Sequence, residues 1–568
     1  MPTTIDSPRS DDDDDNSSNV RYPFLLGSDA EDVRAQYGRD HAGNEGNGGN
    51  ESEADVYVKA EIDTGEVAEG FSWVKLWKYM GPGRFSVGNV GWSIAYLDPG
   101  NLESDLQAGA VAGFSLLWLL LWAHIAGLVI QILAARLGVV TGKHLAQLIR
   151  AHYSRNLSFL IWTFTELAII GSDIQEIVGT AIAFKIIFDL WLPVGVLLTA
   201  CDTFTFMLLQ QYGVRKLEAF FMVLIGTMAV CFWVEMVSSR PDILQIIEGI
   251  VVPRVPQKAV VQAVAMLGAV IMPHNMYLHS ALVMSRDLGS HPTLRKLREA
   301  NFYFALESGA ALLISYLINL ALVVSFAQVY FSPDLPEGTP LPGLYDAVEV
   351  LTRVLGPAAK YLWAGGLLAA GQSSTMTGTL AGQYVIEGFF GAIFKKQWHR
   401  VAITRAIALV PSMLVAVFAV EHFDTMGELL NVLQSICLPT ALIPILKLTS
   451  SASIMSTFRT PTAMVIVCWA LALIITGFNV YLFISYLEHL PVKWIGIVIG
   501  AIYLAFLAYL VYIPVLGMEE IDGASGDGWR SLEEGNEEAE REEYVGRDEL
   551  GVVRDVSGDE IVVDTTRK

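Results

Sequence analysis

The sequence has little cysteine, and the few cysteines it has are far apart. Only four occur in 568 residues, singly inside apolar segments, at Cys201, Cys231, Cys437 and Cys468. Because no two of them form a CxxC pair, neither a thiolate metal site nor a disulfide framework is supported. The chain also begins with polar and acidic residues, so we expect no cleavable signal peptide and a cytosolic N-terminal tail.

The sequence also lacks a Walker A string and a soluble nucleotide domain, which excludes an ATP-driven pump. Charged residues make up only 17% of the chain, whereas hydrophobic residues make up 53%, and the mean hydropathy is +0.45. A chain of this length and composition is too apolar for a soluble enzyme. We therefore expect a membrane protein that is not an enzyme, has no resident cofactor and binds no nucleic acid.

Acidic charge is concentrated at the two ends of the chain. Residues 1–70 contain 18 Asp and Glu against 5 Lys and Arg, and residues 519–568 contain 17 against 6. The two ends together carry a net charge of −24, whereas the whole chain carries −22. The middle of the chain therefore has a net charge near +2. Polar, highly charged segments with few aromatics do not form a packed core. We expect residues 1–70 and 516–568 to be disordered acidic tails that flank one membrane domain, residues 71–515.

Twelve apolar stretches in this domain are long enough to cross a bilayer. They fall near residues 84–112, 115–138, 157–187, 192–211, 217–236, 259–283, 302–330, 358–390, 402–421, 427–447, 462–487 and 493–514. Loops after even-numbered spans contain fourteen Lys and Arg residues, and loops after odd-numbered spans contain six. Cytosolic loops carry the excess of positive charge, so this bias predicts that both tails are cytosolic.

Two tetrapeptides interrupt spans 1 and 6, namely Asp98-Pro99-Gly100-Asn101 and Met272-Pro273-His274-Asn275. Proline removes a backbone donor and clashes with the preceding turn, so neither helix can continue unbroken. Broken backbone inside a bilayer is tolerated where it lines a cavity, and a matched pair of such breaks indicates the substrate site of a secondary transporter. Spans 1 and 6 are five apart, which predicts an all-α protein with a five-plus-five inverted repeat, to which spans 11 and 12 are additions.

The residues at the breaks form a mixed set of possible metal ligands. Asp98 and Asn101 offer a carboxylate and an amide oxygen, and Met272 offers a thioether. Unwinding also frees carbonyls one turn upstream, at Ala95 and Ala269. Calcium and magnesium prefer oxygen alone, whereas a thioether favours later or softer divalent ions. One formal negative charge implies a modest affinity, which suits a site that must release its ion.

Span 3 carries three carboxylates, Glu166, Asp173 and Glu176, within about 80° on one helical face. Unpaired carboxylates inside a membrane are costly, so they need water, protonation or a cation. Arg405 in span 9 is the candidate cation. His274 lies beside the possible metal ligands, and together with it these residues predict a proton path. The alternative is a buried structural ion-pair cluster.

Several stretches resemble the Nramp family of proton-coupled divalent-metal transporters, which have the LeuT-like fold. They are Ala95–Asn101, Leu137–His144, residues 213–221, Ile271–Ser280 and Gly371–Thr375. The resemblance covers roughly residues 75–515 and implies metal ligation by Asp98, Asn101, Met272, Ala95 and Ala269.

The same resemblance implies that Gln434 approaches the ion in some states, and that His274, Asp173, Glu176 and Arg405 move protons. It also implies Mn²⁺ or Fe²⁺ as substrate, with Cd²⁺, Co²⁺ and Zn²⁺ as further possibilities. We expect a monomer that moves its ion toward the cytosol. The sorting strings in residues 21–26 favour a vacuolar or endosomal membrane over the plasma membrane.

Two other functions stay open. A transporter of the same fold could carry an organic solute with sodium, although its breaks would be rich in glycine and would not need both Asp98 and Met272. A non-transporting metal sensor or scaffold is the second alternative. Relatives of that kind have a large soluble C-terminal domain, whereas only about 54 residues of acidic tail follow span 12 here.

Overall fold

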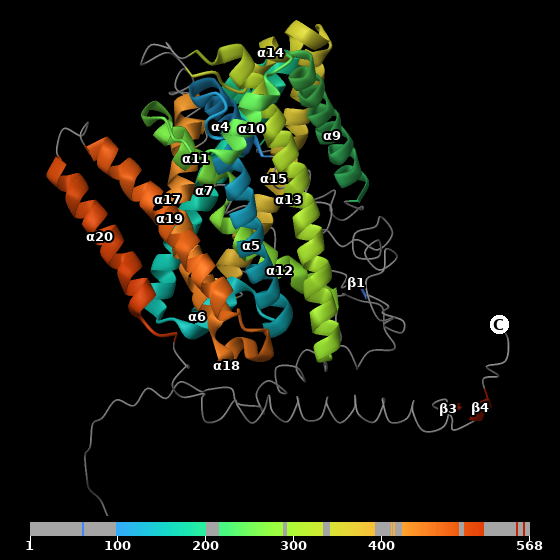
Figure 1. Ribbon diagram of the computed structural model, residues 1–568, viewed down its shortest axis with the longest axis vertical. Helices are drawn as coiled ribbons and strands as arrows, with labels where there is room; N and C mark the ends of the chain where they lie inside the picture. Colours follow the sequence, from blue (N-terminus) through green and yellow to red (C-terminus); the bar gives the residue numbers. More distant parts are fainter. Residues whose placement is uncertain are drawn as a thin grey trace, which may run out of the picture. The chain divides into compact units, whose positions relative to one another are not determined.

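The computed structural model is a helical bundle over the residues that it describes (Figure 1). These are residues 60–61, 98–199, 215–287, 292–332, 341–391, 410–411, 413–414, 423–487, 493–515, 552–554 and 560–562. The first helices are α4 (Pro99–Ala112), α5 (Leu117–Thr141), α6 (Leu145–His152), α7 (Arg155–Phe188), α9 (Arg215–Ser238), α10 (Ile243–Val251), η1 (Gln257–Ala259), α11 (Val260–Val270), α12 (Pro273–Leu282) and η2 (Val283–Ser285).

The later helices are α13 (Leu294–Tyr330), α14 (Ala347–Leu355), α15 (Ala359–Phe390), α17 (Phe423–Ser450), α18 (Ala452–Met455), η4 (Ser456–Phe458), α19 (Thr462–Leu487) and α20 (Lys493–Tyr512). Strands are short: β1 (Ala60–Glu61) pairs in parallel with β2 (Arg286–Asp287), and β3 (Val552–Arg554) pairs antiparallel with β4 (Glu560–Val562). Apart from β2, these strands lie in the tails for which the sequence predicts disorder. Too few tail residues are described to test that prediction.

Long helices occupy most of the predicted spans. Seven described helices or helix pairs are long and apolar enough to cross a membrane, or eight if the bent pair α9–α10 is counted as one. The 32-residue α15 coincides with the predicted span 358–390, although its run of Gly, Ser and Thr makes it less apolar. Three predicted spans are not covered in this way. Residues 84–97 of span 1 and most of spans 4 and 9 lie outside the described residues, although residues 192–199 of span 4 are helical.

The broken helices lie inside the bundle and the last two helices lie at its edge. In the most apolar window of residues 257–282, 94% of residues are buried, against 22% in α19 and 17% in α20. Figure 1 shows α19 and α20 together on one side, with α9 and α13 on the other. Helices α4 and α11 pack against each other, and α17 packs against both. This arrangement agrees with spans 11 and 12 being additions to an inner repeat.

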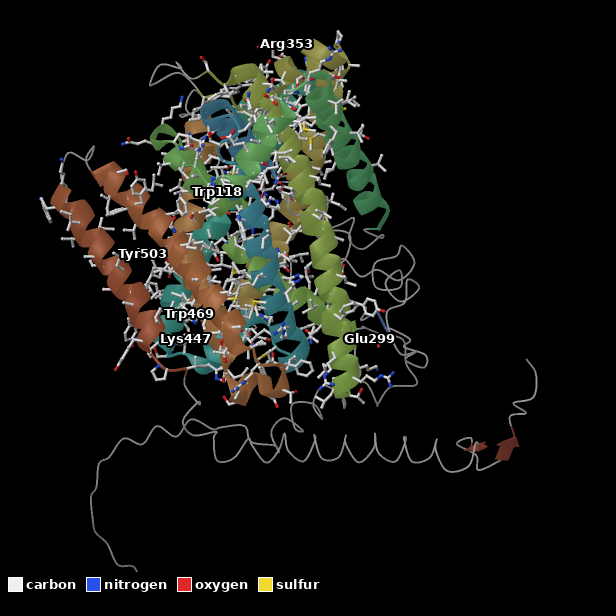
Figure 2. The ribbon with its side chains drawn as sticks, viewed as in Figure 1. Trp118, Glu299, Arg353, Lys447, Trp469 and Tyr503 are labelled. Carbon is white, nitrogen blue, oxygen red and sulfur yellow. The ribbon has the colours of Figure 1, made fainter. Side chains whose placement is uncertain are left out.

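Polar contacts attach α20 to α17. The Lys447 ammonium donates to the carbonyls of Leu510 and Val511, both at 3.1 Å, and also to that of Ile513. The hydroxyl of Tyr503 donates to the carbonyl of Ile436 at 2.6 Å. The last carbonyls of a helix have no partner within it, so a lysine there satisfies them and interacts favourably with the helix dipole. Figure 2 shows Lys447 and Tyr503 on the side of the bundle where α20 lies.

Candidate metal site

Asp98 lies at the first break, where it caps the start of α4. Its backbone is extended, with φ −89° and ψ 164°, and Pro99 follows as the first residue of the helix. One carboxylate oxygen accepts a hydrogen bond from the backbone N–H of Asn101 at 2.6 Å. Aspartate is a preferred N-cap and proline a preferred first residue, because the first N–H groups of a helix have no partner within it. Both Asp98 and Asn101 are 2% exposed.

The second break is built in the same way. Helix α11 ends at Val270, Ile271 departs from helical geometry with φ −108° and ψ 75°, and Met272 is extended before Pro273 begins α12. Met272 and His274 are each 3% exposed. Each break therefore places one predicted metal ligand, a carboxylate or a thioether, at the buried N-cap of a helix.

The two prolines also explain the predicted carbonyl ligands. In an α-helix, each carbonyl accepts from the N–H four residues later. For Ala269 that residue is Pro273, and for Ala95 it is Pro99, so neither carbonyl has this donor. Ala269 is 1% exposed at the end of α11. Ala95 lies outside the described residues, so its carbonyl stays a prediction.

Helix α17 contacts both breaks through one residue, Asn431. Its side-chain amide donates to the carbonyl of Gly100 in the first turn of α4, at 3.0 Å. Its own carbonyl lies so close to Gly268 of α11 that a Cβ atom there would be 1.9 Å away. Gly268 precedes Met272 by four residues. The structure thus brings the two breaks together against one turn of α17, as the inverted repeat predicts.

A chain of amides continues from this turn to Gln434, which is fully buried. The Gln434 amide donates to Gln175 of α7 at 3.0 Å and more weakly to Asn431 at 3.4 Å. The Gln175 amide donates in turn to the carbonyl of Gly427 at 2.8 Å. A Cβ atom at Gly100 would lie 2.7 Å from the side-chain amide oxygen of Gln175, so any larger residue there would displace this side chain. Through Asn431, the predicted site residue Gln434 is therefore connected to Gly100 of α4 and lies one residue away from the packing contact with Gly268 of α11.

The sequence gives no direct signal for three of these neighbours. Asn275, in the first turn of α12, donates its side-chain amide to the sulfur of Met272 at 3.3 Å. Gln175 and Asn431 form the amide chain described above. All three are buried and polar. Asn275 lies within the recognised stretch Ile271–Ser280, and Gln175 and Asn431 each lie within three residues of a predicted site residue, which is the one feature that could have marked them. Gln175 and Asn431 form hydrogen bonds to residues of other helices, and the bond of Asn275 to Met272 depends on the rotamers of both side chains.

The three span-3 carboxylates all lie on α7 and are buried, with Glu166 9%, Asp173 4% and Glu176 2% exposed. The Ser172 hydroxyl donates to Glu176 at 3.2 Å. On α15, a Cβ atom at Gly378 would lie 3.0 Å from Asp173 and 3.3 Å from Glu176. The absence of a side chain at Gly378 therefore lets α15 pass close to both carboxylates.

One oxygen of Glu166 has no hydrogen-bond partner among the described residues. Beside it, the Thr165 hydroxyl donates to the Tyr277 hydroxyl at 3.2 Å, which links α7 to α12. Arg405, the predicted cation for these carboxylates, lies outside the described residues.

Histidines of the bundle interior extend the polar network. His274 is buried, and its Nδ1 has no hydrogen-bond partner among the described residues. His279, two positions after Tyr277, lies 3.3 Å from the Ser308 hydroxyl of α13. His124 of α5 lies 2.8 Å from the Leu120 carbonyl and 3.5 Å from the Asn319 amide. Neither His279 nor His124 was among the predicted site residues.

In the described part of the chain, no group of three or more His, Cys, Asp or Glu side chains is placed to hold a metal ion. A metal at the breaks would therefore rely on one carboxylate together with amide, carbonyl and thioether groups. Such a set is unlike a resident structural site, which is usually closed by several charged ligands.

Two helices with buried polar N-caps, α4 and α12, inside a bundle with two peripheral helices, indicate a transporter of the LeuT-like fold. Comparison with known proteins identifies the family. Residues 90–485 match the model of the Nramp family, described as "Natural resistance-associated macrophage protein-like". The chain belongs to this family of membrane metal transporters and is not an enzyme.

Relatives from distant organisms cover most of the chain. "Natural resistance-associated macrophage protein 2" of Homo sapiens is 47% identical over 485 residues, which is 80% of this chain and 84% of the relative. "Metal transporter Nramp3.2" of Populus trichocarpa is 46% identical over 470 residues, 80% of this chain and 91% of the relative. The crystal structure of a point mutant of the Eremococcus coleocola manganese transporter is 29% identical with a TM-score of 0.67, covering 81% of this chain and 97% of that one.

Proposed function

We propose that this chain carries divalent transition-metal ions, Mn²⁺ or Fe²⁺ before others, toward the cytosol in symport with protons. The observation that supports this most directly is the pairing of Asp98 and Met272. Asp98 is the buried N-cap of α4 and Met272 that of α12. Asn431 donates to Gly100 in the first turn of α4 and lies against Gly268 of α11, the helix that ends just before Met272. A relative named as a manganese transporter has the same fold, which favours Mn²⁺ as the first substrate to test.

The ligand chemistry supports a transition metal over other cations. The proposed ligands are the side chains of Asp98, Asn101 and Met272 and the carbonyls of Ala95 and Ala269. The oxygens suit all divalent ions, whereas the thioether disfavours Ca²⁺ and Mg²⁺ and admits Mn²⁺, Fe²⁺, Co²⁺, Zn²⁺ and Cd²⁺. A single carboxylate binds a dication weakly enough for it to be released on the other side.

Gln434 is proposed to join this set in part of the transport cycle. Its amide is held by Gln175 and Asn431, so it reaches the ion only if α17 moves relative to α7 or if those hydrogen bonds are exchanged. Discontinuous helices are where such a rearrangement is expected in this fold. Ion binding at the breaks would then change the hydrogen bond between Gln434 and Gln175 of α7.

For the proton, we propose a path from His274 through Asp173 and Glu176 to Arg405, with Glu166 further along α7. His274 follows the thioether by two residues, and an imidazole can exchange a proton near neutral pH. Asp173 and Glu176 lie three residues apart on α7, and both carboxylates lie against Gly378 of α15 in the interior. Buried ionisable residues of this kind in transporters usually serve ion or proton movement.

The membrane in which the chain works is part of the proposal. We propose a monomer with both tails in the cytosol, placed in a vacuolar or endosomal membrane. The positive charge of the even-numbered loops supports this orientation, and the strings in residues 21–26 support that membrane.

Transport by purified protein in liposomes tests the function. Quenching of a metal-sensitive dye inside the vesicles is followed for Mn²⁺, Fe²⁺, Cd²⁺, Ca²⁺ and Mg²⁺, with and without an inward proton gradient. We expect Mn²⁺ uptake that rises with the gradient and is accompanied by internal acidification. Uptake of an amino acid driven by sodium would instead support an organic-solute symporter. Metal binding without flux would support a sensor or scaffold, and either result would refute the proposal.

A further inference from the structure

Helix α10 differs from every described spanning helix, because it is short and sharply bent away from its neighbour. It has nine residues and follows α9 after a break of four residues, at an angle of 116°. A helix that makes this angle with a spanning helix lies nearer to the membrane plane than to its normal. The Asp242 side chain caps it by accepting from the N–H of Leu244 at 2.9 Å. Because α10 has its own N-cap and a different direction from α9, it is a separate helix and not a continuation of α9.

Three stripes follow one another around α10, given about 100° per residue. Ile246 and Ile250 face inward against the core of the bundle, and Gly249 lies where a Cβ atom would be 2.2 Å from the Phe114 carbonyl. The next stripe is apolar but exposed, with exposed fractions of 51% to 74%, and consists of Ile243, Leu244, Ile247 and Val251. The third stripe is polar, with Gln245 and with Glu248 in a salt bridge to Arg254 at 3.1 Å.

The surroundings of α10 place it at one end of the membrane-spanning bundle. Figure 1 shows its label beside that of α4, at the same end as α14. Phe114, which it contacts, belongs to the turn between α4 and α5. Nearby, the Trp118 indole donates to the Arg254 carbonyl at 3.0 Å, and the Lys258 ammonium lies 5.5 Å from the centre of the Phe331 ring. Tryptophan and long cationic side chains concentrate where hydrocarbon meets water.

We propose that α10 is an interfacial helix whose exposed apolar stripe is embedded in the lipid at the outer or luminal surface. Its polar stripe then faces water, and the inward stripe of Ile246, Gly249 and Ile250 holds it against the bundle. An exposed stripe of four large apolar side chains next to a polar stripe is the pattern of a helix that lies in the interface plane. Because α10 leads through η1 into α11, the lipid contact would also hold the outer end of the broken helix at a constant depth.

Site-directed spin labelling in liposomes of phosphatidylcholine and phosphatidylglycerol tests this inference. The native cysteines are replaced by alanine, and single cysteines are introduced by Leu244→Cys and Ile247→Cys in the apolar stripe. Gln245→Cys in the polar stripe is the matched control. Labels in the apolar stripe should collide with oxygen several times more often, relative to a water-soluble nickel complex, than the label at the control position.

Two results would overturn the proposal. Equal accessibility of all three labels to the nickel complex would mean that α10 projects into water. Dipolar broadening between labels of different molecules, removed by dilution with unlabelled protein, would mean that a second copy covers the stripe. Each variant is first compared with the parent by thermal unfolding, and if one site fails to fold, Val251→Cys replaces it.

A second inference concerns Asn275 and rests on the proposed function. Its side-chain amide donates to the Met272 sulfur at 3.3 Å, and both side chains are at least nine-tenths buried. A methionine side chain has three flexible bonds and a sulfur that is a weak acceptor. The hydrogen bond restricts the rotation of the thioether and occupies one side of the sulfur. We infer that Asn275 is a positioning residue that directs the remaining lone pair toward the ion and so adjusts selectivity for soft metals.

A double-mutant cycle tests this second inference through the ratio of Cd²⁺ to Mn²⁺ apparent affinities. Asn275→Leu keeps the size of the side chain and removes the donor. It should weaken Cd²⁺ by about threefold to tenfold more than Mn²⁺, the range expected for one hydrogen bond. In a Met272→Ala background, the same change should leave the ratio unaltered. Asn479→Leu, which removes a buried amide bonded to Ser435 of α17, is the matched control.

The outcomes separate the two proposals. An unchanged ratio in Asn275→Leu, or an equal shift with and without Met272, would refute the role of Asn275 while leaving metal transport intact. If the parent protein transports neither ion, the proposed transport function itself is refuted. If Met272→Ala does not alter the ratio, the proposed role of the thioether as a metal ligand is refuted. Asn275→Gln, which restores a donor, should recover part of the ratio and shows that the loss is not a folding defect.

Discussion

Gly268 offers the sharpest structural test of how the two breaks are held together. A Cβ atom at this position would lie 1.9 Å from the Asn431 carbonyl oxygen and 2.7 Å from the Ser435 nitrogen. Ordinary contacts between such atoms begin near 3.4 Å, so Gly268→Ala must separate α11 from α17 by about 1.5 Å. Both obstructing atoms belong to a helix backbone, which cannot rotate away as a side chain can.

We expect this single methyl group to reduce Mn²⁺ transport at least about tenfold. Overpacking of this kind costs about 1–3 kcal/mol, so the protein should still fold with a lower melting temperature. The shift would change the contacts of Asn431 with Gly100 of α4 and Gly268 of α11, and hence disturb the proposed site. Initial rates of Mn²⁺ uptake in liposomes and thermal unfolding of the same preparation measure the two effects.

Gly477→Ala in α19 is the control, because a Cβ atom there meets nothing within 4 Å. Alanine favours the helix over glycine by about 1 kcal/mol, so this variant should transport normally and melt no lower than the parent. If Gly268→Ala had the uptake rate and apparent Mn²⁺ affinity of the parent, close packing of α11 on α17 would not be needed for transport. The reasoning from Asn431 would then be refuted.

Three further variants test individual groups. Met272→Ala should relax selectivity more than it lowers Mn²⁺ transport, because sulfur is the one proposed ligand that Ca²⁺ and Mg²⁺ disfavour. Uptake of Ca²⁺, Mg²⁺ and Cd²⁺ measures this. If the variant gains no Ca²⁺ or Mg²⁺ flux and its Cd²⁺ flux is unaltered, the thioether is not a ligand. Glu176→Gln and His274→Ala should flatten the pH dependence of uptake more than they weaken metal binding, since neither is a proposed ligand. Metal flux recorded together with internal pH measures this, and normal proton flux with lost metal affinity would place both residues in the metal site instead.

Much of the fold follows from properties that act locally along the chain. Hydropathy predicts the span 462–487 where α19 lies, and the span 358–390 where α15 begins one residue later. The breaks follow as directly, since a proline has no N–H to donate wherever it stands. For the same reason, Asp98 and Met272 could be recognised as residues at the ends of half-helices before any helix was placed.

The contacts that join the two breaks could not be predicted in this way. Asn431 and Gly100 are 331 positions apart, and Gln434 and Gln175 are 259 apart. Many buried amides in the sequence could form such pairs, and which ones meet depends on helix packing. The bond between Asn275 and Met272 is local, yet it depends on the rotamers of both side chains, which a sequence pattern does not specify.

The central claim is that Asp98 provides the charge that binds a divalent metal at the two breaks, and Asp98→Asn tests it most directly. Asparagine keeps the shape of the cap and removes the negative charge, and an uncharged buried site cannot offset the dehydration of a dication. We predict that calorimetric titration with Mn²⁺ gives measurable binding for the parent and none for the variant, although both are folded and inserted. Binding by Asp98→Asn with an affinity near that of the parent would contradict the account.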